Sequence, residues 1–356
     1  MSIDLLQSKM KKQGNALMLD LAVSPLLLPP GIIAESSDEF EACQNFAFRL
    51  LTELKGRVAA VRFRVLHYAL LGEYGMKLLS LLLRKAAALG YYTLLDAAGT
   101  TSAEAAKAYA QAIWGEGSVL PCDAILISGY CGTEVVKPFL PYCEKEKKDL
   151  FVSVRLPNKT ASEIQDLLAG SRVVHMAAAD YANRLSGSTM GRLGYSSLCI
   201  AGSATLGDSL KRLRAQYPKL FLLVDGLDEA GANARNASFA FDDLGRGAIC
   251  CVGRSVTGAW MQEEYAGVDF AAAAVDAAMK TQKRINRYVT VMEYVRTSLY
   301  ALRAGACFIL RSSPHQESCR LSRPDRSWNR GWWRCAPCHR YQGRPLRRWA
   351  LWLHRW

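Results

Sequence analysis

Eight short apolar runs separated by amphipathic segments are the feature that most limits how this chain can fold. The runs are continuous rather than alternating, which is typical of strands buried on both faces of a parallel sheet. Eight strand–helix units, with no early G-x-G-x-x-G motif, favour an α/β fold of the (β/α)₈ TIM barrel type over a doubly wound open sheet. The runs cover residues 16–23, 58–63, 91–97, 124–129, 150–156, 197–202, 220–226 and 248–254.

The segments between the runs carry apolar residues at helical spacing and predict the covering helices. The predicted helices cover residues 36–55, 73–89, 102–114, 133–147, 160–186 (in two pieces), 206–216, 233–244 and 269–298. We predict that the barrel occupies residues 1–300. A basic tail rich in Arg, Trp and Cys follows over residues 301–356, and we expect it to be disordered.

The charge of the chain is divided unevenly between these two parts. A formal net charge of +13 would suit a nucleic-acid or membrane-surface partner. However, residues 311–356 hold eleven arginines against only two acidic residues, Glu317 and Asp325. The remainder of the chain is therefore nearly neutral, and its net charge gives no reason to expect a polyanionic partner for the barrel.

The composition of the tail favours a product of translation in a shifted reading frame. Residues 311–356 contain six Trp but no Lys and no Val. A C-x-x-C-H haem-attachment pattern ends at His339, and Cys319, Cys335, Cys338 and His339 could form a zinc knuckle. Arg interleaved with Trp could also stack on single-stranded nucleic acid. We predict no cofactor, no metal and no nucleic-acid partner, and nucleic-acid binding through the tail stays open as an alternative.

The cysteines and the apolar runs indicate a soluble, cytoplasmic protein. The chain has eleven cysteines, eight of them before residue 311 and mostly inside apolar runs, as expected of reduced, buried thiols. An odd number without a secretory signal argues against a disulfide framework. No stretch approaches the roughly 20 apolar residues needed to cross a bilayer. We therefore expect no membrane partner.

The predicted strand ends indicate where chemistry would occur, because barrels of this type hold their active sites at the C-terminal ends of the strands. Phosphate commonly binds at the loops after strands seven and eight, where glycines expose backbone N–H groups and an arginine offers a bidentate fork. Asp96 could instead cap the helix that begins near Ser102. The residues at these ends are Asp20, Arg62, Asp96, Ser128, Gly129, Arg155, Gly202, Ser203, Asp225, Gly226, Gly253 and Arg254.

Several short motifs occur in a fixed order between Ala16 and Trp260. They include Leu19-Asp20, Glu73-Tyr74-Gly75-Met76, Asp96, Tyr130-Cys131-Gly132-Thr133-Glu134, Gly194-Tyr195-Ser196, Gly202-Ser203-Ala204-Thr205 and Gly245-Arg246-Gly247-Ala248-Ile249. In this order and spacing they resemble the orotidine 5′-phosphate decarboxylase family in its longer bacterial form. The resemblance implies conversion of orotidine 5′-monophosphate (OMP) to UMP and CO2 in pyrimidine biosynthesis, by a homodimer that binds a nucleotide monophosphate.

The resemblance also implies roles for particular residues. The catalytic pair would be Asp96 and Arg62, with Arg62 at the position of a family lysine near the substrate carboxylate. Asp20 would hold the ribose hydroxyls and Arg254 the phosphate. The substrate-binding set is Asp20, Tyr130, Gly202, Gly226, Gly253 and Arg254.

Departures from the family pattern concentrate at the positions that carry the chemistry. The proton-donating lysine falls on Ala98, and a later aspartate that reaches across the dimer interface falls on Thr101. The glutamine of the phosphate loop falls on Ala230. Alanine donates no proton, and Arg62 is a poor substitute because arginine is effectively never deprotonated. We predict that decarboxylation is lost or very weak; a non-catalytic nucleotide-binding barrel, or different chemistry around Asp20, Arg62 and Asp96, are the alternatives.

Overall fold

Eight parallel strands close into a barrel in the computed structural model, which describes residues 2–289. Their order around the barrel is β1-β10-β9-β8-β5-β4-β3-β2. Each strand overlaps one of the eight predicted runs, which confirms the (β/α)₈ barrel. The strands are β1 (Leu17–Asp20), β2 (Ala60–Arg64), β3 (Tyr92–Asp96), β4 (Ala124–Ser128), β5 (Asp149–Ser153), β8 (Ser196–Ser203), β9 (Leu220–Asp225) and β10 (Ala248–Val252).

Closure of the barrel depends on pairing between its first and last strands. Met18 of β1 pairs with Cys251 of β10 on one side and with Ala60 of β2 on the other. No strand of the sheet is therefore left as an edge, and the doubly wound open sheet is excluded. All eight pairings are parallel, as expected when each strand is followed by a helix that returns the chain to the same end.

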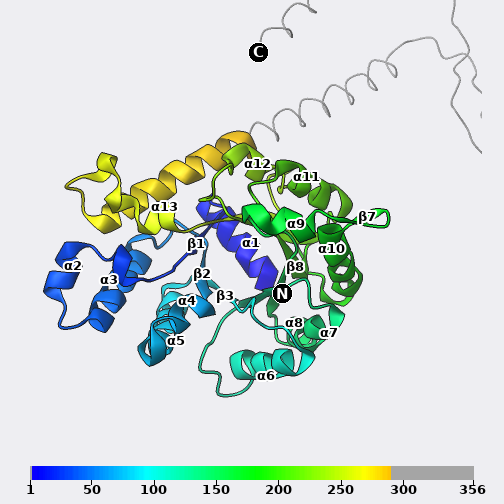
Figure 1. Cartoon of the computed structure of the whole chain (residues 1–356), viewed down its shortest axis with the longest axis horizontal. Coiled ribbons are helices and arrows are strands. Elements are labelled where there is room, and N and C mark those ends of the chain that lie inside the picture. Colours follow the sequence, from blue (N-terminus) through cyan, green and yellow to red (C-terminus); the bar gives the residue numbers. More distant parts are fainter. Residues whose placement is uncertain (1, 290–356) are drawn as a thin grey trace, which may run out of the picture. The chain divides into compact units, whose positions relative to one another are not determined.

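The helices surround the strands in Figure 1. Most lie within the predicted segments, because their apolar faces pack on the outer surface of the barrel. They are α2 (Pro30–Glu35), α3 (Glu39–Glu53), α4 (Val65–Ala69), α5 (Gly72–Leu89), α6 (Ala103–Trp114), α7 (Thr133–Val136), α8 (Leu140–Lys145), α9 (Ser162–Gln165), α10 (Val174–Leu185), α11 (Gly207–Gln216), α12 (Ala234–Ser238), α13 (Arg254–Thr257) and a last helix over residues 270–289. Single 3₁₀ turns interrupt several connections, including η2 (Lys137–Phe139) between α7 and α8.

The segment 160–186, predicted as a helix in two pieces, does form two helices, but the chain between them is not helical. Between α9 and α10 the chain forms an antiparallel hairpin of β6 (Leu168–Ala169) and β7 (Arg172–Val173). Gly170, at the turn, has a φ of +65°, a left-handed conformation that would end a helix. The helix predicted over 233–244 is also shorter, and it begins where Asn233 accepts a hydrogen bond from the N–H of Asn236.

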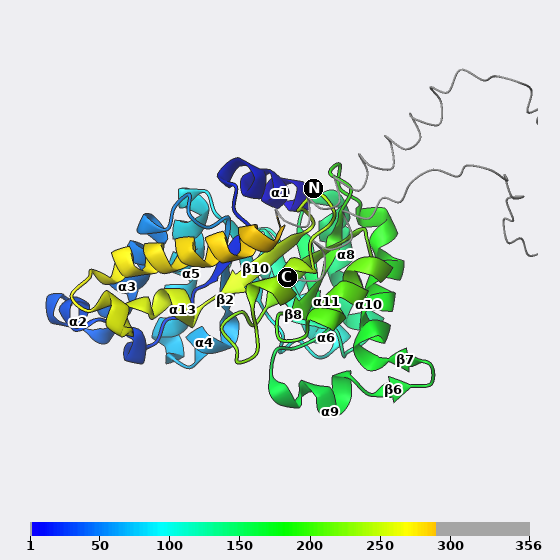
Figure 2. The ribbon, with the colours of Figure 1, turned by 90° about the horizontal axis from the view of Figure 1, so that it is seen from above.

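The N-terminal end of the barrel is closed by a helix that the sequence patterns did not predict, α1 (Ser2–Gln13). Its buried residues Ile3 and Leu6 join an inner core with Phe151, Phe221 and other side chains that point into the barrel. Figure 2 shows α1 at one end of the barrel and α9 with the β6–β7 hairpin at the other. The floor of the barrel is therefore filled mainly with apolar side chains, which leaves the opposite end as the place for a site.

Cysteine placement agrees with the sequence analysis. Within residues 2–289 seven cysteines are free, and all of them except Cys131 are buried. Nor does this part of the chain contain a helix long and apolar enough to span a membrane. The haem, zinc and nucleic-acid interpretations of the tail concern residues 301–356, which lie outside the described residues.

Candidate active site

Charged side chains gather at the mouth of the barrel, where the strands end. Asp20 ends β1, Asp96 ends β3 and Asp225 ends β9. Strand register places Arg62 beside Asp20, and Arg64 beside Asp96. Because parallel strands of a barrel all end at one rim, these five residues face a common space.

Arg62 forms the centre of this cluster and is 1% exposed. Its Nη1 donates to Oδ2 of Asp225 at 2.8 Å, and its Nη2 donates to Oδ1 of Asp225 at 3.0 Å and to Oδ2 of Asp20 at 2.7 Å. Burial alone would raise the pKa of Asp225, but Arg62, Arg64 and the N–H of Gly226 together outweigh burial and hold that pKa below its usual range. Both terminal nitrogens of Arg62 are thus bound to carboxylates of the protein itself.

Arg64 adds a second guanidinium that the sequence analysis did not single out. Its Nε donates to Oδ2 of Asp20 at 2.8 Å, while its Nη2 lies 2.7 Å from that oxygen and 3.9 Å from Oδ1 of Asp225. The sequence spacing could have identified Arg64, because Arg62 and Arg64 are two residues apart on a strand and so point to the same face. Asp20 therefore receives two arginines on one oxygen.

Two atoms of this network are buried without a partner among the described residues, Oδ1 of Asp20 and Nε of Arg62. A buried polar atom without a hydrogen bond is costly, so such atoms normally meet water or a ligand. Oδ1 of Asp20 can accept a hydrogen bond from a hydroxyl. That capacity agrees with the role that the family resemblance implies for Asp20.

Asp96 stands apart from the ion pairs. It makes no salt bridge in the described part of the chain, and its Oδ1 accepts a hydrogen bond from the N–H of Ala98 at 3.1 Å. Burial raises the pKa of Asp96, against the lowering effect of Arg62 and Arg64. Asp96 does not cap α6, since the side chain of Ser102 accepts the hydrogen bond from Ala105 at that helix start. The capping alternative for Asp96 is therefore wrong.

His67, the half-buried histidine of α4, lies close enough to the cluster for its charges to act on the imidazole. Burial lowers the pKa of His67, and Arg64 lowers it further. The imidazole is consequently neutral at pH 7. It does not add a third cation to the mouth.

The predicted phosphate loop is occupied by a side chain. The N–H of Gly253, directly after β10, donates to Oδ2 of Asp228 at 2.7 Å. Asp228 comes from the loop between β9 and α12 and is exposed. Arg254 is also exposed, and it lines a pocket of about 620 Å³ together with Arg284 and Ser255.

The remaining predicted residues have structural contacts. A Cβ added to Gly202 would lie 2.9 Å from a methyl group of Leu210, so this glycine allows α11 to approach β8 outside the barrel. Gly226, with a φ of +73°, faces Pro157. The hydroxyl of Tyr130 donates to the carbonyl of Val154. The structure brings Asp20, Arg62 and Asp96 together at the mouth, but it does not turn Gly202 toward it.

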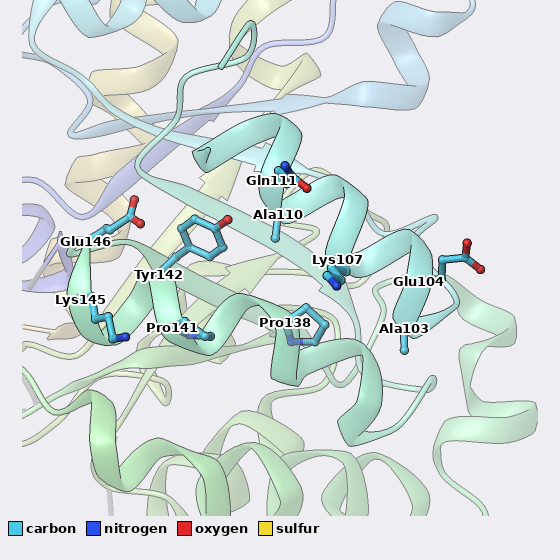
Figure 3. Close-up of a pocket in the computed structure, with 10 residues that line it drawn as sticks. All are labelled: Ala103, Glu104, Lys107, Ala110, Gln111, Pro138, Pro141, Tyr142, Lys145 and Glu146. Atoms are coloured by element: carbon cyan, nitrogen blue, oxygen red, sulfur yellow. The ribbon is translucent and has the colours of Figure 1, made fainter. Parts of the chain in front are cut away.

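A separate groove of about 810 Å³ lies on the outer wall, between α6 and the segment from η2 to α8. Figure 3 shows Lys107 and Gln111 on one side and Pro138, Pro141 and Tyr142 on the other. None of the residues predicted for the site lines this groove. The charged mouth is therefore the candidate site, and the groove belongs to the packing of the outer helices.

Solved structures share this fold. The OMP decarboxylase of Leishmania donovani has a TM-score of 0.64 and 23% identity, covering 81% of this chain and 98% of that one. The enzyme of Methanocaldococcus jannaschii, solved in complex with the inhibitor BMP, has a TM-score of 0.51 and 13% identity, covering 75% of this chain and 98% of that one. At these identities, the similarity shows that the chain shares the fold of these structures.

Curated relatives extend the likeness to the sequence, although no family model matches it. Orotidine 5′-phosphate decarboxylase of Clostridium novyi is 26% identical over 288 residues, which is 80% of this chain and 98% of the relative. The corresponding protein of Caldicellulosiruptor saccharolyticus is 25% identical over 302 residues, covering 81% of this chain and 98% of the relative. The chain is therefore a homologue of the orotidine 5′-phosphate decarboxylases over about 80% of its length.

Proposed function

We propose that this protein is an orotidine 5′-phosphate decarboxylase homologue whose decarboxylation is lost or very weak and whose barrel mouth binds a pyrimidine nucleoside or its monophosphate. The names of the curated relatives support the substrate class and a link to pyrimidine biosynthesis. The converging charged residues Asp20, Arg62 and Asp96 support the mouth as the binding site.

The observation that carries this proposal is the side chain at position 98. Decarboxylation breaks the bond between the ring carbon and the carboxylate, and it leaves an electron pair on the ring that a proton must finally neutralise. A cation beside that carbon stabilises the developing charge, and an acid supplies the proton. Ala98, two residues after Asp96, can do neither.

The other cations at the mouth do not replace the missing group. Arg62 and Arg64 are both bound to carboxylates, and a guanidinium effectively never releases its proton. The imidazole of His67 is neutral at pH 7. Loss of a general acid typically costs 10²–10⁴-fold in rate, and loss of electrostatic stabilisation costs roughly a further 10²–10³-fold.

A decarboxylation assay with OMP, followed by the absorbance change on conversion to UMP, tests the catalytic part. We expect kcat far below about 1 s⁻¹, the low end of the ordinary range. A kcat of about 1 s⁻¹ or more would overturn the catalytic part of the proposal. Calorimetric titration with uridine and UMP tests the binding part, and failure of both to bind at millimolar concentration would refute that part alone.

We also propose that the chain forms the homodimer that the resemblance implies. Thr101 removes the aspartate that the family extends across its interface, but a neutral side chain need not prevent association. Sedimentation equilibrium of the purified chain would decide between a dimer and a monomer. Because catalysis and assembly are separate parts of the proposal, a monomer would not alter the expectation for decarboxylation.

A further inference from the structure

Two aspartates three residues apart, one at the end of β9 and one on the loop after it, each occupy a position at the mouth that could bind an anion. Asp225 holds the terminal nitrogens of Arg62, and Asp228 holds the N–H of Gly253. Neither contact is needed to build the strands, since the side chain of Arg62 and the N–H of Gly253 lie outside the ladder between β9 and β10. The loop thus places two negative charges at the two donor positions.

Asp225 meets Arg62 as a carboxylate ligand would. The two oxygens of one carboxylate accept from the two terminal nitrogens of one guanidinium, at 2.8 and 3.0 Å. This fork is the strongest arrangement that an arginine offers a carboxylate. With Asp20 on Nη2 as well, Arg62 has little capacity left for a carboxylate on a ligand.

Asp228 occupies a donor that barrels of this type use for phosphate. The loops after the seventh and eighth strands of such barrels commonly bind phosphate through backbone N–H groups. Here these strands are β9 and β10, and a carboxylate oxygen lies 2.7 Å from the N–H of Gly253. The exposed Arg254 and Arg284 line the adjoining pocket, so the place is suited to an anion.

The turn between the two carboxylates is fixed in place. Gly226 has a φ of +73°, and an added Cβ there would lie 2.3 Å from Pro157. The N–H of Gly226 donates to Oδ1 of Asp225 at 2.8 Å, and the N–H of Glu229 donates to the carbonyl of Gly226 at 3.1 Å. An incoming anion would therefore have to displace carboxylates that the backbone already positions.

We propose that Asp225 and Asp228 act as built-in anions in place of a ligand's carboxylate and phosphate, so that the mouth selects an uncharged pyrimidine nucleoside over its phosphorylated or carboxylated forms. The identity of the nucleoside rests on the proposed function, whereas the competition with anions rests on these contacts. Three carboxylates, Asp20, Asp96 and Asp225, already face two guanidiniums, so a carboxylate of a ligand placed beside them is repelled.

The test compares uridine, UMP and inorganic phosphate on the full chain and on Asp228→Asn. In the unaltered protein we expect uridine to bind at least as tightly as UMP, and phosphate up to 20 mM to leave the melting temperature unchanged. In Asp228→Asn we expect UMP to gain at least tenfold in affinity relative to uridine, and phosphate to raise the melting temperature. Glu116→Gln, an equal charge change at an exposed loop on the opposite end of the barrel, should change neither quantity.

The outcomes distinguish a failure of the built-in-anion proposal from a failure of the proposed function. The proposal would be overturned if the unaltered protein bound UMP more than tenfold more tightly than uridine. It would also be overturned if phosphate stabilised the unaltered protein and Asp228→Asn equally. If neither uridine nor UMP binds, the proposed ligand class fails, and the phosphate comparison still decides the role of Asp228. Because Asp228 is exposed, Asp228→Asn is expected to fold, and Asp228→Ala is a second variant with the same expected gains.

Discussion

The guanidinium of Arg62 donates hydrogen bonds to both carboxylate oxygens of Asp225, from a side chain that is 1% exposed. The two residues belong to strands on either side of β1 and β10 in the barrel order, so the pair crosses the mouth. In the pair, the guanidinium and the carboxylate neutralise each other. If one partner were removed, the other would lose this counterion at a site that is largely closed to water. The stability of this barrel is therefore expected to depend on that pairing.

Replacement of Asp225 by Asn is expected to destabilise the protein by about 3–5 kcal/mol, because it leaves the buried Arg62 with Asp20 as its one remaining salt-bridge partner. Urea denaturation measures the change. The double variant Arg62→Leu, Asp225→Leu should lose much less than the sum of the single changes, since a buried ion pair can be replaced by apolar groups. A loss below about 1 kcal/mol for Asp225→Asn would show that water already screens the pair.

The floor of the barrel contains another buried carboxylate, Asp149 at the start of β5, and its burial predicts a pH dependence of stability. Burial raises the pKa of Asp149 to about 7, although the hydroxyl of Tyr92 donates to it at 2.6 Å. A folded-state pKa above the unfolded value means that the folded state binds the proton more tightly. The contribution of Asp149 to stability is therefore full below about pH 4 and is lost as the pH rises to about 7.

Asp149→Asn should remove this dependence. The difference in unfolding free energy between the variant and the unaltered protein is expected to change by up to about 1.4 kcal/mol per pH unit between pH 4 and 7, in favour of the variant, and to level off above pH 7. Chemical denaturation at a series of pH values measures this difference in unfolding free energy. The contributions of the titrating groups that both proteins share cancel in the difference. A difference that stays constant with pH would contradict the raised pKa.

Restoring the family residues at two positions is not expected to restore ordinary catalysis. In Ala98→Lys, Thr101→Asp the new ammonium would lie near Asp96, but Arg62 would remain bound to Asp225. We expect OMP decarboxylation to stay below about 1 s⁻¹. If this variant alone reached an ordinary rate, the pairing of Arg62 would have no bearing on the reaction.

Gly247, just before β10, is expected to tolerate no side chain. It has a φ of +79°, and an added Cβ would lie 2.3 Å from the ring of Tyr195. Gly247→Ala should cost roughly 1–3 kcal/mol or more through this overlap, in addition to the cost of the left-handed backbone. Gly117→Ala is the matched control, since its φ is +75° and its Cβ would meet nothing within 4 Å. Equal losses of melting temperature in both variants would assign the effect to the backbone alone.

The barrel could be predicted because burial on both faces gives each strand a continuous apolar run, such as the one that becomes β9. The helix α1 could not be predicted in the same way. It covers the end of a barrel rather than its side, so its buried residues Ile3 and Leu6 depend on a floor that forms only when the barrel closes. The hairpin at Gly170 was missed because strands of two residues have no detectable period.

The charged residues of the site could be located from the sequence, but their partners could not. Asp20, Arg62 and Asp96 follow from strand ends, a rule that depends only on topology. Which carboxylate meets Arg62 depends on side-chain reach across the mouth, between residues 163 positions apart in the chain. The contact of Asp228 with Gly253 depends on the turn at Gly226, which local sequence rules do not fix.

The pairing of β1 with β10 has a consequence for synthesis on the ribosome. Residues 17–19 hydrogen-bond to residues 250–252, which emerge from the ribosome on the order of tens of seconds later at ordinary elongation rates. During that interval one edge of the first strand, an apolar strand, has unpaired backbone groups that can join another chain. Nascent chains of this protein are therefore exposed to aggregation until the last strand emerges, and binding of a chaperone to the early strands would raise the yield of folded barrel.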